Sequence, residues 1–422
     1  MGSGDNENMT RTTGAALIAV LCLSALAAAG RVLSAASADE PPPTFTAAQL
    51  LTPAQLKGPH HTVAGVVQTE GYYHEFRIQS DFGAFDAFGS SQLAVRLHEV
   101  EALAKLDDVS KTEVFLAAAG HSVVNVGKGV ANVVTEPADT AKNLGSGIKR
   151  WGVNLGRQSK RAVDSATSDD PAEASRQGDN AAVSAGKAVL GVSRASRRWA
   201  QKVGVDPYTT NAVLRKALDD FGQADAAGSI ATKVVLPIPG VVGMTATVSD
   251  LVWSKDPEEL RKFNEQRLRE LGVPDATAKK LFLNSAMTLS LETRLIASLH
   301  AVRIPGAADR VAAAADSRHE REALFHVESA ELLQERHAKA PFTELLTDSL
   351  ATAAVAANGQ AFVLLPVDWL RWTTVNDSSL HEIDARARKE LKATSLTIVL
   401  TGKASPAASK ALAGLGWRVG PA

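Results

Sequence analysis

Cysteine is almost absent from this sequence. Cys22 is the single one among 422 residues, so a chain that begins after it has no disulfide bonds and no thiol chemistry. A strong net charge is also missing, because 45 basic and 46 acidic side chains leave −1 at pH 7, and no global field draws the protein to nucleic acid. Aromatic residues make up only 5%. A composition rich in Ala, Val and Leu is typical of a mostly helical protein with small side chains at its helix contacts.

Sequence motifs of the common enzyme classes are missing too. There is no GxSxG pattern and no phosphate-binding loop, since the Gly-rich segments 127–129 and 145–147 lack the preceding strand that such a loop needs. The sequence therefore predicts no catalytic residue and no cofactor. Whether the protein is an enzyme stays open at this point, although the missing motifs favour a protein that is not an enzyme.

The first 38 residues predict a secretory signal peptide. Residues 9–11 form a short basic start, and residues 14–29 form an apolar run that is short for a membrane span. Residues 36–38 (Ala-Ser-Ala) predict a cleavage site before Asp39. An uncleaved N-terminal anchor is the alternative. Cys22 lacks the small preceding residue of lipoprotein signals, so lipidation is not expected. In either case we expect an exported protein of the periplasm or cell envelope.

The rest of the sequence predicts an α+β protein that is predominantly helical. Alternating patterns near both ends predict strands, and patterns with three-to-four-residue steps between them predict helices joined by short turns in a bundle. The expected parts are a small α+β domain (39–118), basic amphipathic Gly-rich helical segments (119–203) with a polar link (164–180), a helical domain (204–345) and a C-terminal α/β domain (346–422).

The two ends carry the clearest strand patterns. In the N-terminal part we expect strands over 61–70, 71–80 and 84–88, with His74, Phe76 and Ile78 on a buried face, and a helix over 92–106 that ends before a new helix cap at 108–110. In the C-terminal part we expect strands over 360–365, 395–400 and 417–419, alternating with helices over 379–392 and 406–414.

Residues 121–163 are the most unusual stretch. Apolar side chains recur every three or four residues along one helical face, and basic residues far outnumber acidic ones. Several glycines weaken this helix, each by about 1 kcal/mol relative to Ala, so it needs a surface on which to fold. Residues 181–203 repeat the basic amphipathic pattern. Each segment has one Trp beside paired basic residues, and the candidate contact residues are Lys149, Arg150, Trp151, Arg157, Arg197, Arg198 and Trp199.

Three interpretations of these basic segments are open. They brace the core as scaffold helices, they dock on an anionic membrane surface, or they bind another envelope protein. Docking is physically reasonable because Lys and Arg contribute about 1 kcal/mol each near anionic headgroups, and because Trp favours the lipid–water boundary. Nucleic acid is not expected as a partner of an exported protein.

Other candidate residues have weaker patterns. His319, Glu322 and His326 lie on one helical face with a spacing that zinc accepts, but their charged neighbours favour a solvated helix surface, and no metal is predicted. Asp368 follows a buried strand, where sites often form in α/β layers, although a structural hydrogen bond is the simpler role. Ser405 is expected to cap a helix.

Several short segments are distinctive when taken together. They are 109–115 (VSKTEVF), 134–137 (VTEP), 204–211 (GVDPYTTN), 365–368 (LPVD), 400–406 (LTGKASP) and 415–417 (LGW). With them, the mature chain resembles a group of uncharacterised exported proteins of Gram-negative bacteria. The resemblance implies export and carries no known activity.

These observations give one leading hypothesis and two alternatives. The leading hypothesis is a non-enzymatic periplasmic or envelope-associated protein that docks on an anionic membrane through its basic amphipathic helices. The first alternative is a metal-binding protein or hydrolase that uses the His/Glu face around His319. The second is a pore-forming or toxin-like protein that inserts the apolar residues 226–253, which otherwise form a buried helical pair. The oligomeric state stays open.

Overall fold

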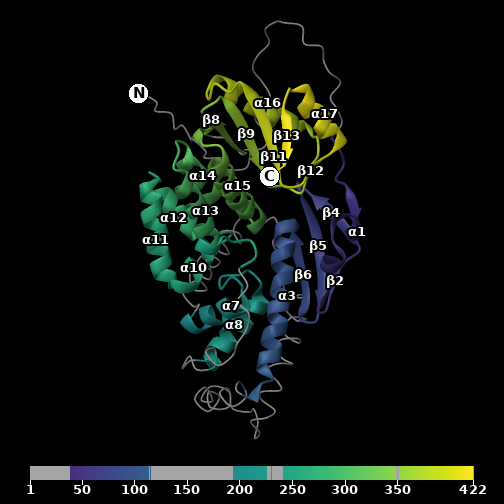
Figure 1. Cartoon of the computed structure of the whole chain (residues 1–422), viewed down its shortest axis with the longest axis vertical. Coiled ribbons are helices and arrows are strands. Elements are labelled where there is room, and N and C mark those ends of the chain that lie inside the picture. The colour runs from purple at the N-terminus through teal and green to yellow at the C-terminus, as the bar shows by residue number, and fades with distance from the viewer. Residues whose placement is uncertain are drawn as a thin grey trace, which may run out of the picture. The chain divides into compact units, whose positions relative to one another are not determined.

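The computed structural model describes residues 39–113, 115, 193–225, 230, 241–347 and 351–421. Helices and sheets both occur in this part of the chain (Figure 1), so the predicted α+β class is confirmed. The Gly-rich stretch 121–163 and the polar link lie outside the described residues. Within the described ranges, no helix is both long enough and apolar enough to cross a bilayer.

Residues 44–88 form an antiparallel sheet. Its strands are β1 (Thr44–Thr46), β2 (Lys57–Gly58), β3 (His61–Val63), β4 (Val66–Glu70), β5 (Tyr73–Ser80) and β6 (Gly83–Phe88), in the order β1-β4-β5-β3-β2 with β6 on β5. The strand predicted over 61–70 is broken into β3 and β4, which pair with different halves of β5. The predicted face of β5 is confirmed, since His74, Phe76 and Ile78 are buried. Two short helices, α1 (Ala47–Leu50) and α2 (Pro53–Leu56), follow β1.

Helix α3 (Ser90–Ser110) connects this sheet to the helical part. Leu93 and Leu97 pack in the core of the sheet, whereas Leu103 and Leu106 pack with the helices that follow. The cap predicted at 108–110 is wrong because the helix continues through these residues. Val109 is buried in the same core as Leu106, and this packing outweighs the local capping signal.

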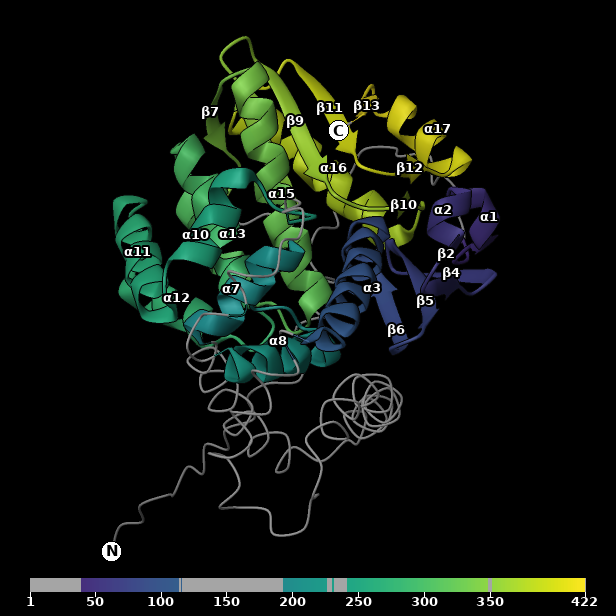
Figure 2. The same cartoon turned by 60° about the horizontal axis from the view of Figure 1, so that its bottom comes forward.

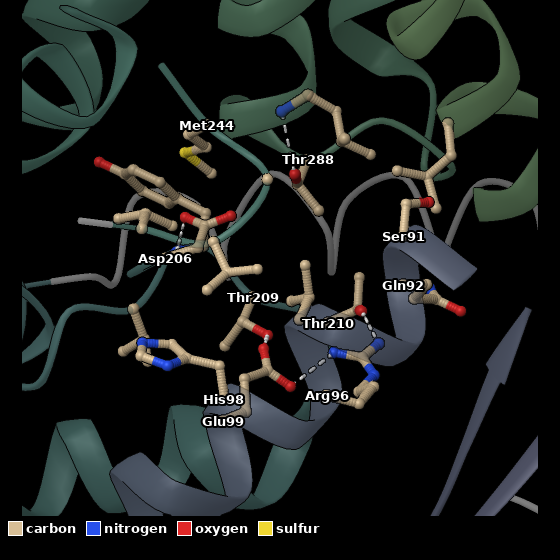
Figure 3. Close-up of a pocket in the computed structure, with 18 of the residues that line it drawn as sticks. Ser91, Gln92, Arg96, His98, Glu99, Asp206, Thr209, Thr210, Met244 and Thr288 are labelled. Carbon is tan, nitrogen blue, oxygen red and sulfur yellow. Dashed lines mark hydrogen bonds and ion pairs between the residues drawn. The ribbon is translucent and has the colours of Figure 1, made fainter. Parts of the chain in front are cut away.

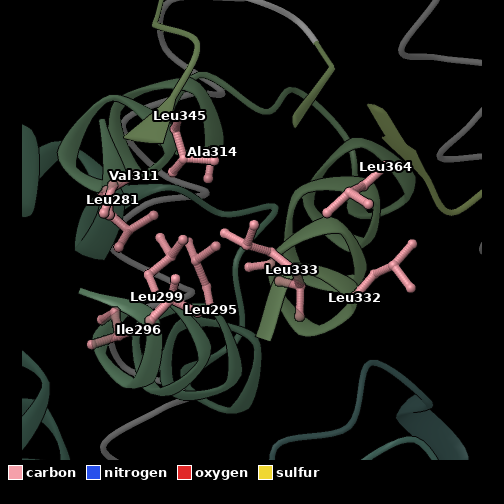
Figure 4. Packing of buried hydrophobic residues seen from close by; sticks show 14 of the residues in the cluster. Leu281, Leu295, Ile296, Leu299, Val311, Ala314, Leu332, Leu333, Leu345 and Leu364 are labelled. Atoms are coloured by element: carbon pink, nitrogen blue, oxygen red, sulfur yellow. The ribbon is translucent and has the colours of Figure 1, made fainter. Parts of the chain in front are cut away.

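The middle of the chain is helical. Its described helices are α7 (Arg194–Val203), α8 (Ala212–Ala224), α10 (Ala246–Ser254), α11 (Pro257–Glu270), α12 (Asp275–Leu283), α13 (Leu289–Val302), α14 (Ala307–Ala315) and α15 (Glu320–Lys339). The largest hydrophobic core joins α11 to α15 with one face of the C-terminal sheet. Figure 4 shows Leu295 and Leu299 of α13 pointing toward Leu333 of α15.

The C-terminal sheet has the strand order β13-β11-β9-β8-β7. The elements are β7 (Phe342–Leu345), β8 (Thr352–Ala356), β9 (Gln360–Leu365), β10 (Trp369–Leu370), α16 (Thr374–Lys389), β11 (Ser395–Leu400), β12 (Lys403–Ala404), α17 (Pro406–Gly414) and β13 (Arg418–Pro421). The predicted alternation of strands and helices is confirmed, and β9, β11 and β13 run parallel. Strands β7 and β8 add antiparallel pairs that were not predicted.

Both faces of the C-terminal sheet are covered by helices. Leu364 and Val399 belong to the core of α13 and α15, and Figure 2 shows α15 beside β9. Val363 and Ile398 point to the other face and pack with α16 and α17. Strands that are buried on both faces read as continuous apolar runs, which explains why β9 and β11 were easy to predict.

The first described residues are tied to the C-terminal part of the chain. The described residues from Asp39 onward belong to one compact unit. Asp39 Oδ1 accepts from the N–H (2.6 Å) and the hydroxyl (2.8 Å) of Thr374. Glu40 N–H donates to Trp372 O (3.0 Å), and Arg371 Nη1 donates to Glu40 O (2.8 Å). Residues 39 and 40 therefore lie beside the segment that joins β10 to α16.

Candidate functional site

A groove lies where the N-terminal sheet, the helical part and the C-terminal sheet meet. Its volume is about 1140 Å³. The described lining comes from β1, α1 and β5, the start of α3, the loop before α10, helices α13 and α15, and the loops after β9 and β11. Ligand sites in α/β folds form beyond the carboxyl ends of parallel strands. We call this site the junction groove.

The loops after β9 and β11 are held together tightly. Gly402 N–H donates to Val367 O (2.8 Å), and Lys403 N–H donates to Asp368 O (2.9 Å). A Cβ on Gly402 would lie 2.0 Å from Asp368 O, so only glycine allows this approach of the two backbones. Strands β10 and β12 extend the contact by pairing Trp369 with Lys403. The two loops therefore present a fixed edge to the junction groove.

Asp368 joins this edge to the N-terminal part. Its Oδ2 accepts from His74 N–H (2.9 Å), and its Oδ1 accepts from Ser90 N–H (3.1 Å). Ser90 begins α3, whose N-cap Gly89 has no side-chain acceptor. A carboxylate 278 residues away in sequence therefore supplies the negative charge that a helix N-terminus favours. The structural hydrogen bond predicted for Asp368 is confirmed.

Aromatic side chains form part of the groove wall. Phe45 packs edge-on against Trp369, with 5.2 Å between ring centroids, and against His74, with 5.1 Å. Phe45, Tyr73 and Trp369 are half-buried, and the Tyr73 hydroxyl donates to Pro366 O (3.1 Å). Rings that are fixed by such contacts but partly exposed offer flat apolar surface to a ligand.

Carboxyl groups of α15 line the same groove. Arg294 donates twice to Glu331, at 2.8 Å each. Glu328 instead accepts from Ser91 Oγ (2.6 Å). Burial raises the pKa of Glu328 to about 7, although the hydrogen bond from Ser91 and the charge of Arg294 lower it; the charges of Glu331 and Asp368 raise it further. Glu328 therefore changes its charge near neutral pH, unlike an ordinary surface carboxylate.

A smaller cavity of about 80 Å³ adjoins the junction groove. The residues that line both are Ser91, Gly243, Met244, Arg294 and Glu328. Figure 3 shows Arg96 and Glu99 of α3 pointing toward Thr210 and Thr209. Glu99 accepts from Arg96 Nη1 (2.8 Å), Asn211 Nδ2 (3.0 Å) and the Thr209 hydroxyl. A buried carboxylate with this many donors is a structural element that fixes the cavity wall.

Asp206 holds the next part of this wall. Its Oδ1 accepts from Tyr208 N–H (2.8 Å) and from Ser290 Oγ (2.5 Å). Burial raises the pKa of Asp206 to about 6, although both hydrogen bonds lower it. Through Asp206 and Glu99, the turn 204–211 is bonded to α13 on one side and to α3 on the other. The turn therefore positions the elements around the smaller cavity.

The predicted membrane-contact residues divide into two groups. Those outside the described residues are Lys149, Arg150, Trp151 and Arg157. Trp199 is 0% exposed and packs edge-on against Phe221, with 4.9 Å between ring centroids, and Arg197 is 5% exposed. Arg198 Nη2 lies 3.9 Å from Asp225 Oδ2. The expectation that Trp199 and Arg197 meet a membrane is therefore corrected, because α7 presents them to protein and braces the core.

The three zinc candidates do not assemble into a metal site. His319 is the exposed N-cap residue of α15, and Glu322 accepts from Arg318 N–H (2.7 Å). Burial, with the charge of Arg310, lowers the pKa of His326 to about 4. In the part of the chain that the structure describes, no three His, Cys, Asp or Glu side chains gather to hold a metal ion.

Two further expectations fall partly within the described residues. Ser405 caps α17 as predicted, because its Oγ accepts from Ala408 N–H (3.0 Å), and it also donates to Glu40. Of the apolar stretch 226–253, the described helix α10 buries Val248 and Val252 in a small core with Tyr208. Most of the remainder of that stretch lies outside the described residues.

The chain matches no protein-family model, no curated protein and no solved structure. The resemblance to exported proteins of Gram-negative bacteria therefore stays a prediction. Three of the segments that carry it, 204–211, 365–368 and 400–406, contribute lining residues to the two cavities. Their clustering and the position of Asp368 after a buried strand are the sequence signals that point to this site. Phe45 and Glu328 had no signal of their own, and sequence reasoning missed them.

Proposed function

We propose that this chain is an exported protein of the periplasm or cell envelope that binds a small molecule in the junction groove. The groove itself carries the proposal. It has a volume of about 1140 Å³, half-buried aromatic rings and a carboxyl group, Glu328, that titrates near neutral pH. Small-molecule sites are concave surfaces of about this size, with apolar walls and a few polar groups, where separate parts of a fold meet.

The export part of the proposal rests on the sequence pattern of residues 1–38, which predicts a signal peptide. Asp39 is the residue after the predicted cleavage site, and its side chain is bonded to Thr374. Cleavage before Asp39 would leave this tether intact. N-terminal sequencing of periplasmic protein is expected to start at Asp39. A start at Met1 or Met9 on membrane-embedded protein would establish an anchor instead.

Native mass spectrometry of the protein, purified from its own envelope, tests the binding function. Ala338 is exposed on α15 and lines the groove, so Ala338→Trp is expected to occupy part of it and obstruct a ligand. Ala385 is equally exposed on α16 and is not part of the described groove lining, so Ala385→Trp is the matched control. A bound small molecule should accompany the wild type and the control and be lost from Ala338→Trp. Equal occupancy in both variants would contradict the proposal.

Membrane docking is retained as a second candidate for residues 121–163 alone. We propose that this basic stretch forms the amphipathic Gly-rich helices that its pattern predicts, and that Lys149, Arg150, Trp151 and Arg157 meet anionic lipid. Vesicle co-sedimentation tests this. Neutralising Lys149, Arg150 and Arg157 together should abolish binding to anionic vesicles. Binding that is equal on neutral vesicles would remove the electrostatic mechanism.

A further inference from the structure

Carboxyl groups outnumber basic groups in the described lining of the junction groove. The carboxyl groups are those of Glu328, Glu331, Glu335 and Asp368, and the fully basic side chains are Arg294 and Lys403. In the adjoining cavity, Glu99, Asp206 and Glu320 add to this excess, against Arg96. A concave surface with an excess of one charge concentrates ligands of the opposite charge.

Most of these carboxyl groups already have partners. Glu331 holds Arg294, and Glu335 accepts from Lys339 Nζ (2.6 Å). Asp368 accepts one backbone N–H at each oxygen. Glu328 differs, because its described partner is the Ser91 hydroxyl and no ion pair among the described residues includes it. Glu328 is therefore the carboxyl group of the groove that a ligand cation would neutralise.

The aromatic wall lies in the neighbourhood of Glu328. The charges of Glu328 and Asp368 both raise the pKa of the Tyr73 hydroxyl, after burial, the largest cause. Trp369 follows Asp368 directly and packs against Phe45. Half-exposed aromatic faces attract organic cations, Trp most strongly, and a nearby carboxylate adds to that attraction. Aromatic rings and a carboxyl group that forms no ion pair among the described residues are thus present in one groove.

We infer that the junction groove binds an organic cation, an ammonium compound with an apolar stem, whose charge lies beside Glu328 and whose stem lies against Phe45 and Trp369. This inference rests on the proposed binding function. A divalent metal is a poorer match, because the described residues provide no cluster of metal ligands. An anion would have to use Lys403, the exposed lining cation, and would meet the carboxyl groups of α15.

Isothermal titration with three probes, each with a six-carbon chain, tests the inference. The probes are hexyltrimethylammonium, hexanoate and hexanol, and the protein is the full mature chain at pH 8. The cation is expected to bind at least tenfold more tightly than either of the other probes. Glu328→Gln should weaken cation binding about tenfold or more and leave hexanol binding unchanged. Glu322→Gln is the matched control on the same helix, because Glu322 is not part of either described lining.

A second variant keeps the test informative if Glu328→Gln folds poorly. Trp369→Leu retains an apolar side chain but removes the aromatic face, so it should weaken binding of hexyltrimethylammonium severalfold more than binding of hexanol. Cation affinity that is unchanged in both variants would overturn the inference. Lys403→Gln should leave cation binding the same or slightly tighter.

The outcomes separate the inference from the function on which it rests. If all three probes bind equally and Ala338→Trp blocks them, the inference of an organic cation would be overturned. The proposal that the groove binds a small molecule would stand. If the protein prefers hexanoate and loses this preference in Lys403→Gln, the inference of an organic cation would also be overturned, and the groove would be an anion site. Binding of no probe at all, or binding that Ala338→Trp does not affect, would count against both proposals.

Discussion

Trp199 and Trp369 both stand beside charged residues in the sequence, yet they occupy different environments. Trp199 follows two arginines on α7 and is fully buried against Phe221 of α8. Trp369 follows Asp368, is half-buried, and lines the junction groove with Phe45. Residue type and local charge therefore do not separate a core side chain from a binding surface. What separates the two environments is the set of elements that pack around each Trp.

The largest expected effect is on stability, and it differs between the two tryptophans. Trp199→Ala should lower the free energy of unfolding by about 3–5 kcal/mol, because a large buried ring leaves a cavity. Trp369→Ala should lower it by about 1 kcal/mol, because the ring is only half-buried and the groove is already open. Urea unfolding of both variants measures the difference. Equal losses would mean that the two environments are alike.

A pair of glutamates extends the comparison to charge. Glu292 of α13 is 1% exposed. Arg261 Nη2 lies 3.4 Å from it and lowers the pKa of this carboxyl group, but burial has the larger effect and raises the pKa to about 8. The folded protein therefore binds more protons than the unfolded chain between about pH 5 and 8, and its stability falls with rising pH by up to about 1.4 kcal/mol per unit.

Glu292→Gln is expected to remove this slope, so the variant should gain stability relative to the wild type as pH rises from 5 to 8. Glu328→Gln should remove a similar fall of stability with pH that ends nearer pH 7, because burial raises the pKa of Glu328 to about 7. Unfolding free energies at pH 5, 7 and 8 measure both effects. If each variant keeps the pH dependence of the wild type, the burial of these carboxyl groups is not as described.

The last of these effects concerns the contact that forms the edge of the groove. Asp368→Ala leaves the N–H groups of His74 and Ser90 without their acceptor and should cost about 1–3 kcal/mol of unfolding free energy. Asp368→Asn keeps one oxygen acceptor and should cost less. Hydrogen exchange at His74 and Ser90 provides a local measurement. Unchanged exchange in Asp368→Ala would show that the tether is unimportant.

Local sequence patterns predicted the elements whose apolar residues form a continuous run or repeat with the period of a helix. Strands β9 and β11 and helix α17 follow from apolar runs or three-to-four-residue steps, and the cap at Ser405 follows from one Ser-Pro pair. The interruption between β3 and β4 did not follow, because strand pairing and not residue type decides where a strand breaks.

The candidate site could not be predicted in the same way. Asp368 was a candidate, but the donors that it meets lie near residues 74 and 90, and no local pattern encodes that distance. Trp199 was a candidate for membrane contact, with scaffold packing left open, because an amphipathic pattern shows that one face is apolar without showing whether protein or lipid covers it. Glu328 lies on a helix rich in charge, and its unusual pKa arises from burial that the sequence does not display.

Hydroxyl-radical footprinting of the mature protein tests the central claim most directly, because it reports the exposure of each Trp separately. We expect Trp369 to be oxidised in the free protein and protected by hexyltrimethylammonium, while Trp199 stays unmodified throughout. Anionic vesicles should not alter the labelling of either residue. Oxidation of Trp199 in the folded protein that vesicles suppress, with Trp369 unaffected by the cation, would contradict the account and return α7 to the membrane surface.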